Sequence, residues 1–164
     1  MGRPAAKPVA MPLSRRELLL GTASLLAGAS GRAAETDLPR AQALPQHLAD
    51  ALARGLPLTV MVSLPGCPFC KVVRDQHLTP LLQSRAAAVV QVDMGSPLAL
   101  LNWSDQPVSH AEQVRRWAVR VAPTVLFFGR QGKEVAERLV GSLLPDFYGA
   151  YLMQRLETAR QSLA

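Results

Sequence analysis

Apolar residues between positions 44 and 64 follow two different periods. One group recurs at helical spacing and stops before the Gly-Leu-Pro sequence at residues 55–57, namely Leu44, Leu48, Ala51 and Leu52. Residues 58–64 form a continuous apolar run, which is typical of a buried strand. We therefore expect a short helix and then a buried strand, preceded by a loose polar segment at residues 35–45.

The same alternation continues downstream. Apolar positions at helical spacing follow residue 70 and predict a second helix, bent or broken near Pro80; they are Val72, Val73, Leu78, Leu81 and Leu82. Residues 87–94 predict a second buried strand. Ser109 and Glu112 have the spacing of a capping box and predict the start of a third helix. Its apolar face would contain Val114, Trp117, Ala118 and Val121.

The last part of the chain predicts a hairpin and a helix. Residues 123–128 and 134–140 are expected strands on either side of a tight turn, and Pro145 opens the final helix. The order of elements is therefore βα, βα, β-hairpin, α, which indicates an α/β fold. Residues 95–109 form a long connection with leucines and Trp103. They either select a substrate or cap the core.

Residues 1–34 have the pattern of an export signal. A basic start precedes an apolar stretch at residues 18–30, and small residues follow at a plausible cleavage site. The adjacent Arg15 and Arg16 resemble a twin-arginine signal. Cleavage near residue 34 would leave 13 basic and 11 acidic residues in one domain, residues 35–164. A net charge of +2 gives no support to a nucleic-acid partner.

The two cysteines of the chain form a CPFC sequence, Cys67-Pro68-Phe69-Cys70. A strand that ends before residue 67 and a helix that begins there would place Cys67 at a helix N-terminus. The helix dipole and Lys71 should then lower the pKa of Cys67 and favour its reactive thiolate. Cys70, one helical turn later, could attack a mixed disulfide formed by Cys67.

Two other interpretations of the cysteine pair remain. A zinc site would need further ligands, and the three histidines have no finger-like spacing from the pair. A static cross-link is also conceivable, but so short a loop gains little stability from one.

Three features together resemble the thioredoxin superfamily: the order of elements, a CxxC at the first strand-to-helix junction, and VAPTVLFF at residues 121–128. The resemblance covers nearly all of residues 41–161. It implies a thioredoxin fold, with a central mixed sheet of about four strands flanked by helices. It also implies a cis bond between Ala122 and Pro123 beside the active-site disulfide. Ala122 and Pro123, together with Pro68 and Phe69, would bind an extended client segment.

Two positions depart from the thioredoxin pattern. Gly66 replaces a tryptophan before the first cysteine, and Met61 replaces a buried acid. Without that carboxylate, Cys70 must give its proton to water or another base, and its attack should be slower at neutral pH. Pro68 and Phe69 resemble glutaredoxin and periplasmic isomerase sites, but nothing after Pro123 looks like the paired glycines of glutaredoxins.

The resemblance favours a periplasmic thiol–disulfide oxidoreductase that reduces a dedicated protein client through Cys67 and Cys70. Reduction outside the cytosol requires electrons from across the membrane, so we expect a membrane thiol-transfer protein as partner. We expect no metal and no small-molecule cofactor. A disulfide donor or isomerase would use the same cysteines, whereas a chaperone would use the groove beside Pro123 without them. A copper chaperone is disfavoured because no histidine is adjacent to Pro123.

Overall fold

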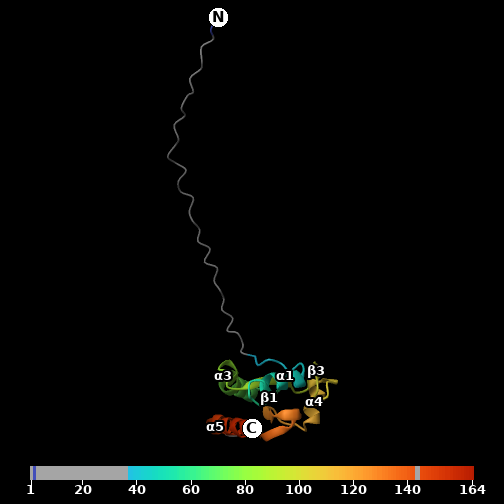
Figure 1. The fold of residues 1–164 in the computed structure, drawn as a ribbon, viewed down its shortest axis with the longest axis vertical. Coiled ribbons are helices and arrows are strands. Elements are labelled where there is room, and N and C mark those ends of the chain that lie inside the picture. The colour runs from blue at the N-terminus through green and yellow to red at the C-terminus, as the bar shows by residue number, and fades with distance from the viewer. Residues whose placement is uncertain (1, 3–36, 143–144) are drawn as a thin grey trace. The chain divides into compact units, whose positions relative to one another are not determined.

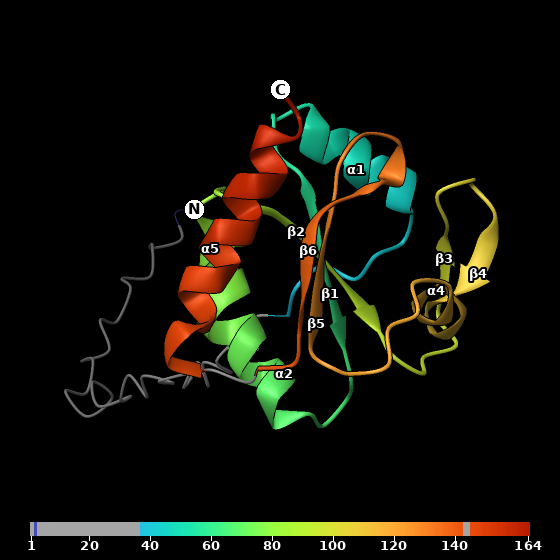
Figure 2. The same ribbon diagram turned by 90° about the horizontal axis from the view of Figure 1, so that it is seen from below.

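Four strands form the central sheet, in the order β2-β1-β5-β6. Figures 1 and 2 show the fold from two directions. β1 (Leu58–Ser63) is parallel to β2 (Ala88–Asp93) and antiparallel to β5 (Thr124–Phe128). β6 (Glu134–Val140) follows the short turn η2 (Arg130–Gly132) and is antiparallel to β5. The mixed sheet of four strands that the resemblance implied is confirmed.

The computed structural model describes residues 2, 37–142 and 145–164. The predicted export signal at residues 1–34 therefore lies outside the described residues, apart from residue 2. Within the described part of the chain, none of the helices has the length and apolar character needed to cross a membrane.

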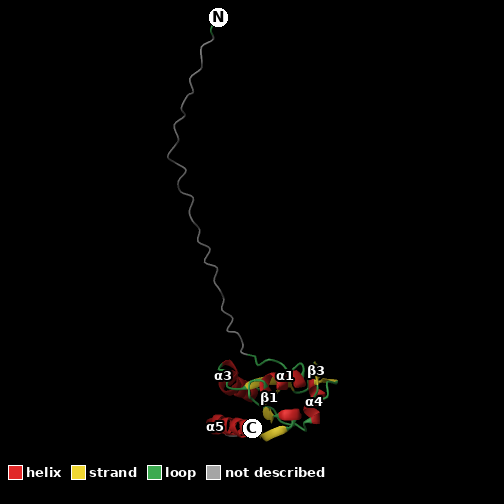
Figure 3. Ribbon diagram, in the orientation of Figure 1, coloured by secondary structure: helices red, strands yellow, loops and turns green. Residues whose placement is uncertain are grey.

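Helices cover both faces of the sheet (Figure 2). They are the red segments in Figure 3. On one face, α1 (Leu44–Leu52) and α4 (His110–Arg116) pack against residues such as Val60 and Val62 of β1. On the other, α5 (Pro145–Gln161) and the helix after the CPFC sequence pack with Met61. Because both faces are covered, successive residues of β1 are all buried, and the strand has a continuous apolar sequence.

The helix after the CPFC sequence changes its hydrogen-bond register without ending. α2 (Pro68–Val72) passes into a π-helical segment, η1 (Val73–Leu78), and then into α3 (Thr79–Gln83). The irregular turn therefore lies before Pro80, not at it. Proline has no N–H and its ring clashes with the preceding turn, and a π-helical turn relieves that conflict within a continuous helix.

Residues 95–109 contain two strands that the sequence did not predict. β3 (Ala99–Leu101) and β4 (Pro107–Ser109) form an antiparallel hairpin. Leu100 and Val108 enter the core, and the Trp103 ring lies 4.9 Å from the Phe128 ring between centroids. The hairpin therefore caps the core. Strands of three residues are too short to show a period in the sequence.

The third helix begins as predicted but ends early. The Ser109 hydroxyl accepts a hydrogen bond from the Glu112 N–H at 3.1 Å, whereas the Glu112 carboxylate pairs with Arg116. The helix ends at Arg116, and Ala118 has a φ of 53°. The predicted apolar face was therefore wrong at Ala118 and Val121, which lie in the following loop and are exposed.

The segment before α1 is not loose. Residues 37–43, which we call the N-terminal strap, run along the outer edge of β2. The Gln91 N–H donates to the Pro39 carbonyl and the Ala41 N–H to the Gln91 carbonyl, each at 2.8 Å. Leu38 is buried in the same cluster as Met61 of β1 and Leu152 of α5. The prediction failed here because a strap held by backbone hydrogen bonds needs no apolar period.

Candidate active site

The two cysteines lie at the junction of β1 and α2 and form a disulfide. Cys67 is the N-cap of α2, and its Sγ accepts a hydrogen bond from the Cys70 N–H at 3.1 Å. Cys67 is half-buried, whereas only 1% of Cys70 is exposed. The structure thus places the two predicted catalytic residues together, with Cys67 as the less buried of the two.

Gly66 determines how the chain enters α2. Its φ is 74°, in the left-handed region that glycine adopts with little cost. The turn lets the Cys67 N–H donate to the Leu64 carbonyl at 3.2 Å. Glycine at this position, where thioredoxins have tryptophan, therefore has a local conformational reason.

The loop before β5 lies against the cysteine pair. The bond between Ala122 and Pro123 is cis, as the resemblance implied. The Ala122 carbonyl oxygen lies 3.9 Å from the Cys67 Sγ, and Pro123 is buried. The Thr124 hydroxyl donates to the Val121 carbonyl at 2.7 Å and holds the loop closed. An extended client segment that pairs with Ala122 would thus lie beside the reactive sulfur.

Cys67 also lines a cavity of about 430 Å³. Its walls come from the N-terminal strap, the ends of β1 and β2, and the start of the helix; the charged lining residues are Asp37, Arg40, Lys71, Arg74 and Asp93. Asp93 ends β2 directly beside Ser63, the last residue of β1. Sequence reasoning missed Asp93, although an acid at the end of a buried strand parallel to β1 was a usable signal.

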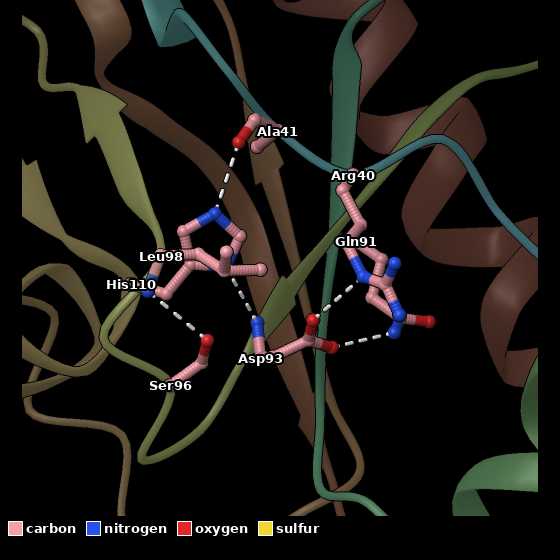
Figure 4. Close-up of polar contacts among 7 residues, drawn as sticks. All are labelled: Arg40, Ala41, Gln91, Asp93, Ser96, Leu98 and His110. Carbon is pink, nitrogen blue, oxygen red and sulfur yellow. Dashed lines mark hydrogen bonds and ion pairs between the residues drawn. The ribbon is translucent and has the colours of Figure 1, made fainter.

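Hydrogen bonds hold the Asp93 carboxylate in place (Figure 4). The Arg40 Nε donates to one carboxylate oxygen at 3.0 Å, and the Gln91 amide donates to the other at 2.6 Å. The Asp93 N–H donates to His110 Nδ1, and His110 Nε2 lies 3.0 Å from the Ala41 carbonyl. Because Nδ1 accepts, the hydrogen-bond pattern assigns the proton to Nε2.

A family model for the thioredoxin-like domain matches residues 44–155, more than half of the chain. The chain belongs to the thioredoxin-like domain family. Two solved structures are similar to it. A thioredoxin from Thermus thermophilus is 27% identical, with 77% of this chain and 90% of that chain covered and a TM-score of 0.50. A DsbH oxidoreductase is 17% identical, with 76% and 85% covered and a TM-score of 0.51. No curated protein sequence matches.

Family membership and the CxxC pair together support thiol–disulfide oxidoreductase activity on protein thiols or disulfides, at a general level. The position of the buried acid of thioredoxins is occupied by Met61, which is fully buried in the same cluster as Cys70. In the described residues, no group of three or more His, Cys, Asp or Glu side chains is arranged to hold a metal.

Four exposed apolar residues of this thioredoxin-like domain lie close in the chain to the cysteines or to the cis bond. Phe69 is 60% exposed, and Leu64, Val72 and Val121 are also exposed. Single exposed apolar residues are common, but several in the segments that carry the cysteines and the cis bond are suited to contact with a protein client. Pro68 and Phe69 therefore lie at the surface, where the resemblance placed a client.

The helix contributes two cations to the cavity lining, Lys71 and Arg74, and both form ion pairs with Asp75. Lys71 pairs with Asp75 at 2.6 Å, and Arg74 pairs with it at 3.2 Å. Burial raises the pKa of Asp75, but hydrogen bonds and positive charge from Lys71 and Arg74 outweigh it, so the pKa lies below its usual value. Asp75 therefore offsets part of the positive charge that Lys71 was expected to bring to Cys67.

Proposed function

We propose that this thioredoxin-like domain is exported to the periplasm and reduces the disulfides of a dedicated protein client. The observation that carries the proposal is the arrangement of three groups. Cys67 is half-buried, and its Sγ lies 3.9 Å from the Ala122 carbonyl oxygen, next to the cis bond before Pro123. Cys70, its disulfide partner, is buried. This arrangement exposes one sulfur to a bound client and shields the other.

In the proposed reaction the Cys67 thiolate attacks one sulfur of the client disulfide. A mixed disulfide forms and the first client sulfur leaves as a thiolate. Cys70 then loses its proton and attacks the Cys67 sulfur, which releases the second client thiolate and forms the Cys67–Cys70 disulfide. Two electrons pass to the client, and its two thiolates take up protons. A membrane dithiol protein would return two electrons to the oxidised domain.

The N-terminal sequence supports the proposed location. Residues 1–34 combine basic residues, a modest apolar stretch and adjacent arginines at positions 15 and 16, the composition of a twin-arginine signal. Expression of the full chain in a bacterium should yield a periplasmic product shortened near residue 34. The Arg15→Lys/Arg16→Lys variant should stay in the cytoplasm. A cytoplasmic, full-length wild-type product would contradict export.

The roles of the two cysteines are tested by trapping. The full chain should reduce insulin disulfides with dithiothreitol as electron source, and Cys67→Ser should abolish this activity because the remaining thiol, Cys70, is buried. Cys70→Ser should accumulate a mixed disulfide that migrates as a covalent adduct on a non-reducing gel. The double variant is the matched control. If Cys70→Ser forms no adduct while Cys67→Ser does, the assignment of roles is reversed.

The direction of electron flow is tested by equilibrating the Cys67–Cys70 pair with defined glutathione buffers. A reductase should have a strongly negative reduction potential, near that of reducing thioredoxins. A potential near the oxidising end of the range would instead support a disulfide donor or isomerase that uses the same site.

A further inference from the structure

The N-terminal strap is fixed to the domain at several points. Its backbone pairs with Gln91 on the edge of β2, and Leu38 is only 3% exposed in the core. The His110 ring bridges the strap to β2, because its two nitrogens contact the Ala41 carbonyl and the Asp93 N–H, each at 3.0 Å. Arg40, which lies between these anchors, is therefore held at a defined place.

Arg40 lines the cavity beside Cys67. The Arg40 guanidinium contacts the Asp93 carboxylate at 3.0 Å; the Arg40 side chain is 56% exposed and that of Asp93 only 10%. Among the described ion pairs, Arg40 is the cation that compensates Asp93, whereas Lys71 and Arg74 both contact Asp75. Without Arg40, an uncompensated negative charge would remain in the wall of the cavity.

Such a charge would act on Cys67. A carboxylate and a thiolate in one partly buried cavity repel each other more strongly than in bulk water, because less solvent screens them. A carboxylate that is paired with a cation exerts a much weaker electric field on the thiolate at the same distance. The thiolate of Cys67, and with it the reduced state of the domain, therefore depends on whether Asp93 is neutralised.

We propose that Arg40, carried by the N-terminal strap, is a positioning residue that neutralises Asp93 and thereby stabilises the Cys67 thiolate. The inference rests on the proposed function, since it assigns a residue that tunes the same reaction. It also gives the strap a role: the strap brings to Asp93 the cation that pairs with it, whereas the cations of the helix contact Asp75.

The experiment is a double-mutant cycle on the full chain with Arg40→Gln, Asp93→Asn and both together. Iodoacetamide alkylation of the reduced protein as a function of pH reports the Cys67 thiolate, and equilibrium with glutathione reports the disulfide. Arg40→Gln should shift the alkylation midpoint to higher pH and slow alkylation below it by about two- to fivefold, the scale of a partly exposed ion pair. It should also make the domain more reducing.

Asp93→Asn should shift both readouts the opposite way, because the positive charge of Arg40 is then uncompensated and favours the Cys67 thiolate. The double variant should give values close to those of the wild type. Arg40→Lys should also differ little from the wild type, because lysine keeps the positive charge. The matched control is Arg116→Gln, which removes an arginine from an exposed ion pair outside the cavity and should change neither readout. A merely structural role for the pair would not produce shifts of opposite sign.

Shifts of the same sign in the two single variants, or none in either, would overturn the inference. If Arg40→Gln does not fold, Asp93→Asn alone decides, because an amide keeps the shape of the carboxylate and only one direction of shift agrees with the proposal. The outcome is separate from that of the proposed function. Wild-type protein that reduces insulin while all variants titrate alike refutes the role of Arg40 only; inactive wild type refutes the proposed function.

Discussion

At the residue scale, Cys67 and Cys70 have opposite surroundings. The Cys67 sulfur contacts the Ala122 carbonyl next to the cis bond, and Cys67 also lines a polar cavity. Cys70 is buried with Met61 in an apolar cluster. A thiol in such surroundings resists ionisation, because burial disfavours its charged form. In the proposed reaction, the surroundings of Cys70 therefore give little help to its attack on the mixed disulfide.

Met61→Asp tests this view of Cys70. A carboxylate at this fully buried position should cost about 2–5 kcal/mol of stability, with a larger loss at higher pH where it is charged. If the variant stays folded, the carboxylate should accept a proton from Cys70 and speed resolution of the mixed disulfide. Urea unfolding and single-turnover kinetics measure the two effects. Met61→Leu should cost under about 1.5 kcal/mol and leave resolution unchanged.

His77 makes stability depend on pH. Burial lowers the pKa of His77 below the usual value of a histidine, and its ring lies 5.0 Å from that of Tyr148. A depressed pKa in the folded state means that stability is complete above the unfolded value and decreases as pH falls through the folded one. The melting temperature should therefore drop between about pH 7 and pH 5.

His77→Gln should reduce this drop, because glutamine does not titrate. His47, whose pKa burial also lowers, contributes a similar slope, so the double variant should lose more of the pH dependence than either single one. Melting curves at several pH values measure the effect. An unchanged slope in the double variant would contradict this assignment.

At the element scale, short segments with weak sequence patterns complete the domain. The N-terminal strap widens the sheet beside β2, and the β3–β4 hairpin caps one end of the core. Neither has an apolar period, since each is held by a few backbone hydrogen bonds and one or two buried side chains. The π-helical turn before Pro80 has no apolar period either, because it arises from the steric conflict between Pro80 and the preceding helical turn.

Leu38→Ala tests whether the strap is part of the fold. Leu38 is 3% exposed, and truncation of a buried leucine typically costs about 2–5 kcal/mol. Gln42→Ala, at an exposed position of the same strap, should change stability by less than about 0.5 kcal/mol. Urea unfolding compares the two variants. Equal stability of both would show that the strap is peripheral.

At the scale of the whole molecule, the reactive cysteines and the packing of the hairpin lie at opposite ends of the sheet. The end where β1 and β2 finish carries the cysteines and the polar cavity. Towards the other end, Trp103 of the hairpin packs on Phe128 and over the turn between β5 and β6. Packing at that end joins the hairpin to the sheet without touching the reactive sulfur.

Gly132→Ala tests this packing. A Cβ at residue 132 would lie 2.6 Å from the Trp103 ring, and its φ is 65°, so both a clash and backbone strain oppose alanine. Gly55→Ala is the matched control, because its φ is 68° but no atom lies within 4 Å. The control should cost about 1–2 kcal/mol, and Gly132→Ala about 1–3 kcal/mol more. Equal losses in thermal unfolding would contradict the docking of Trp103.

The sequence alone determined the order of the main elements and the identity of the thiol pair. β6 and the start of α5 lie where the pattern predicts them, because apolar period and turn residues are local properties. The resemblance added the cis bond before Pro123 and the mixed sheet. The roles of the substrate-binding residues Pro68, Phe69, Ala122 and Pro123 stay predictions.

Only the tertiary structure decided which charges lie beside Cys67. Arg40 and Asp93 are 53 residues apart in the chain, and no periodicity relates them. They meet because the strap adds to the edge of β2 and because β2 ends in register with β1. Strand pairing and register are long-range properties, which depend on how the whole domain packs; a local pattern of apolar and polar residues does not contain them.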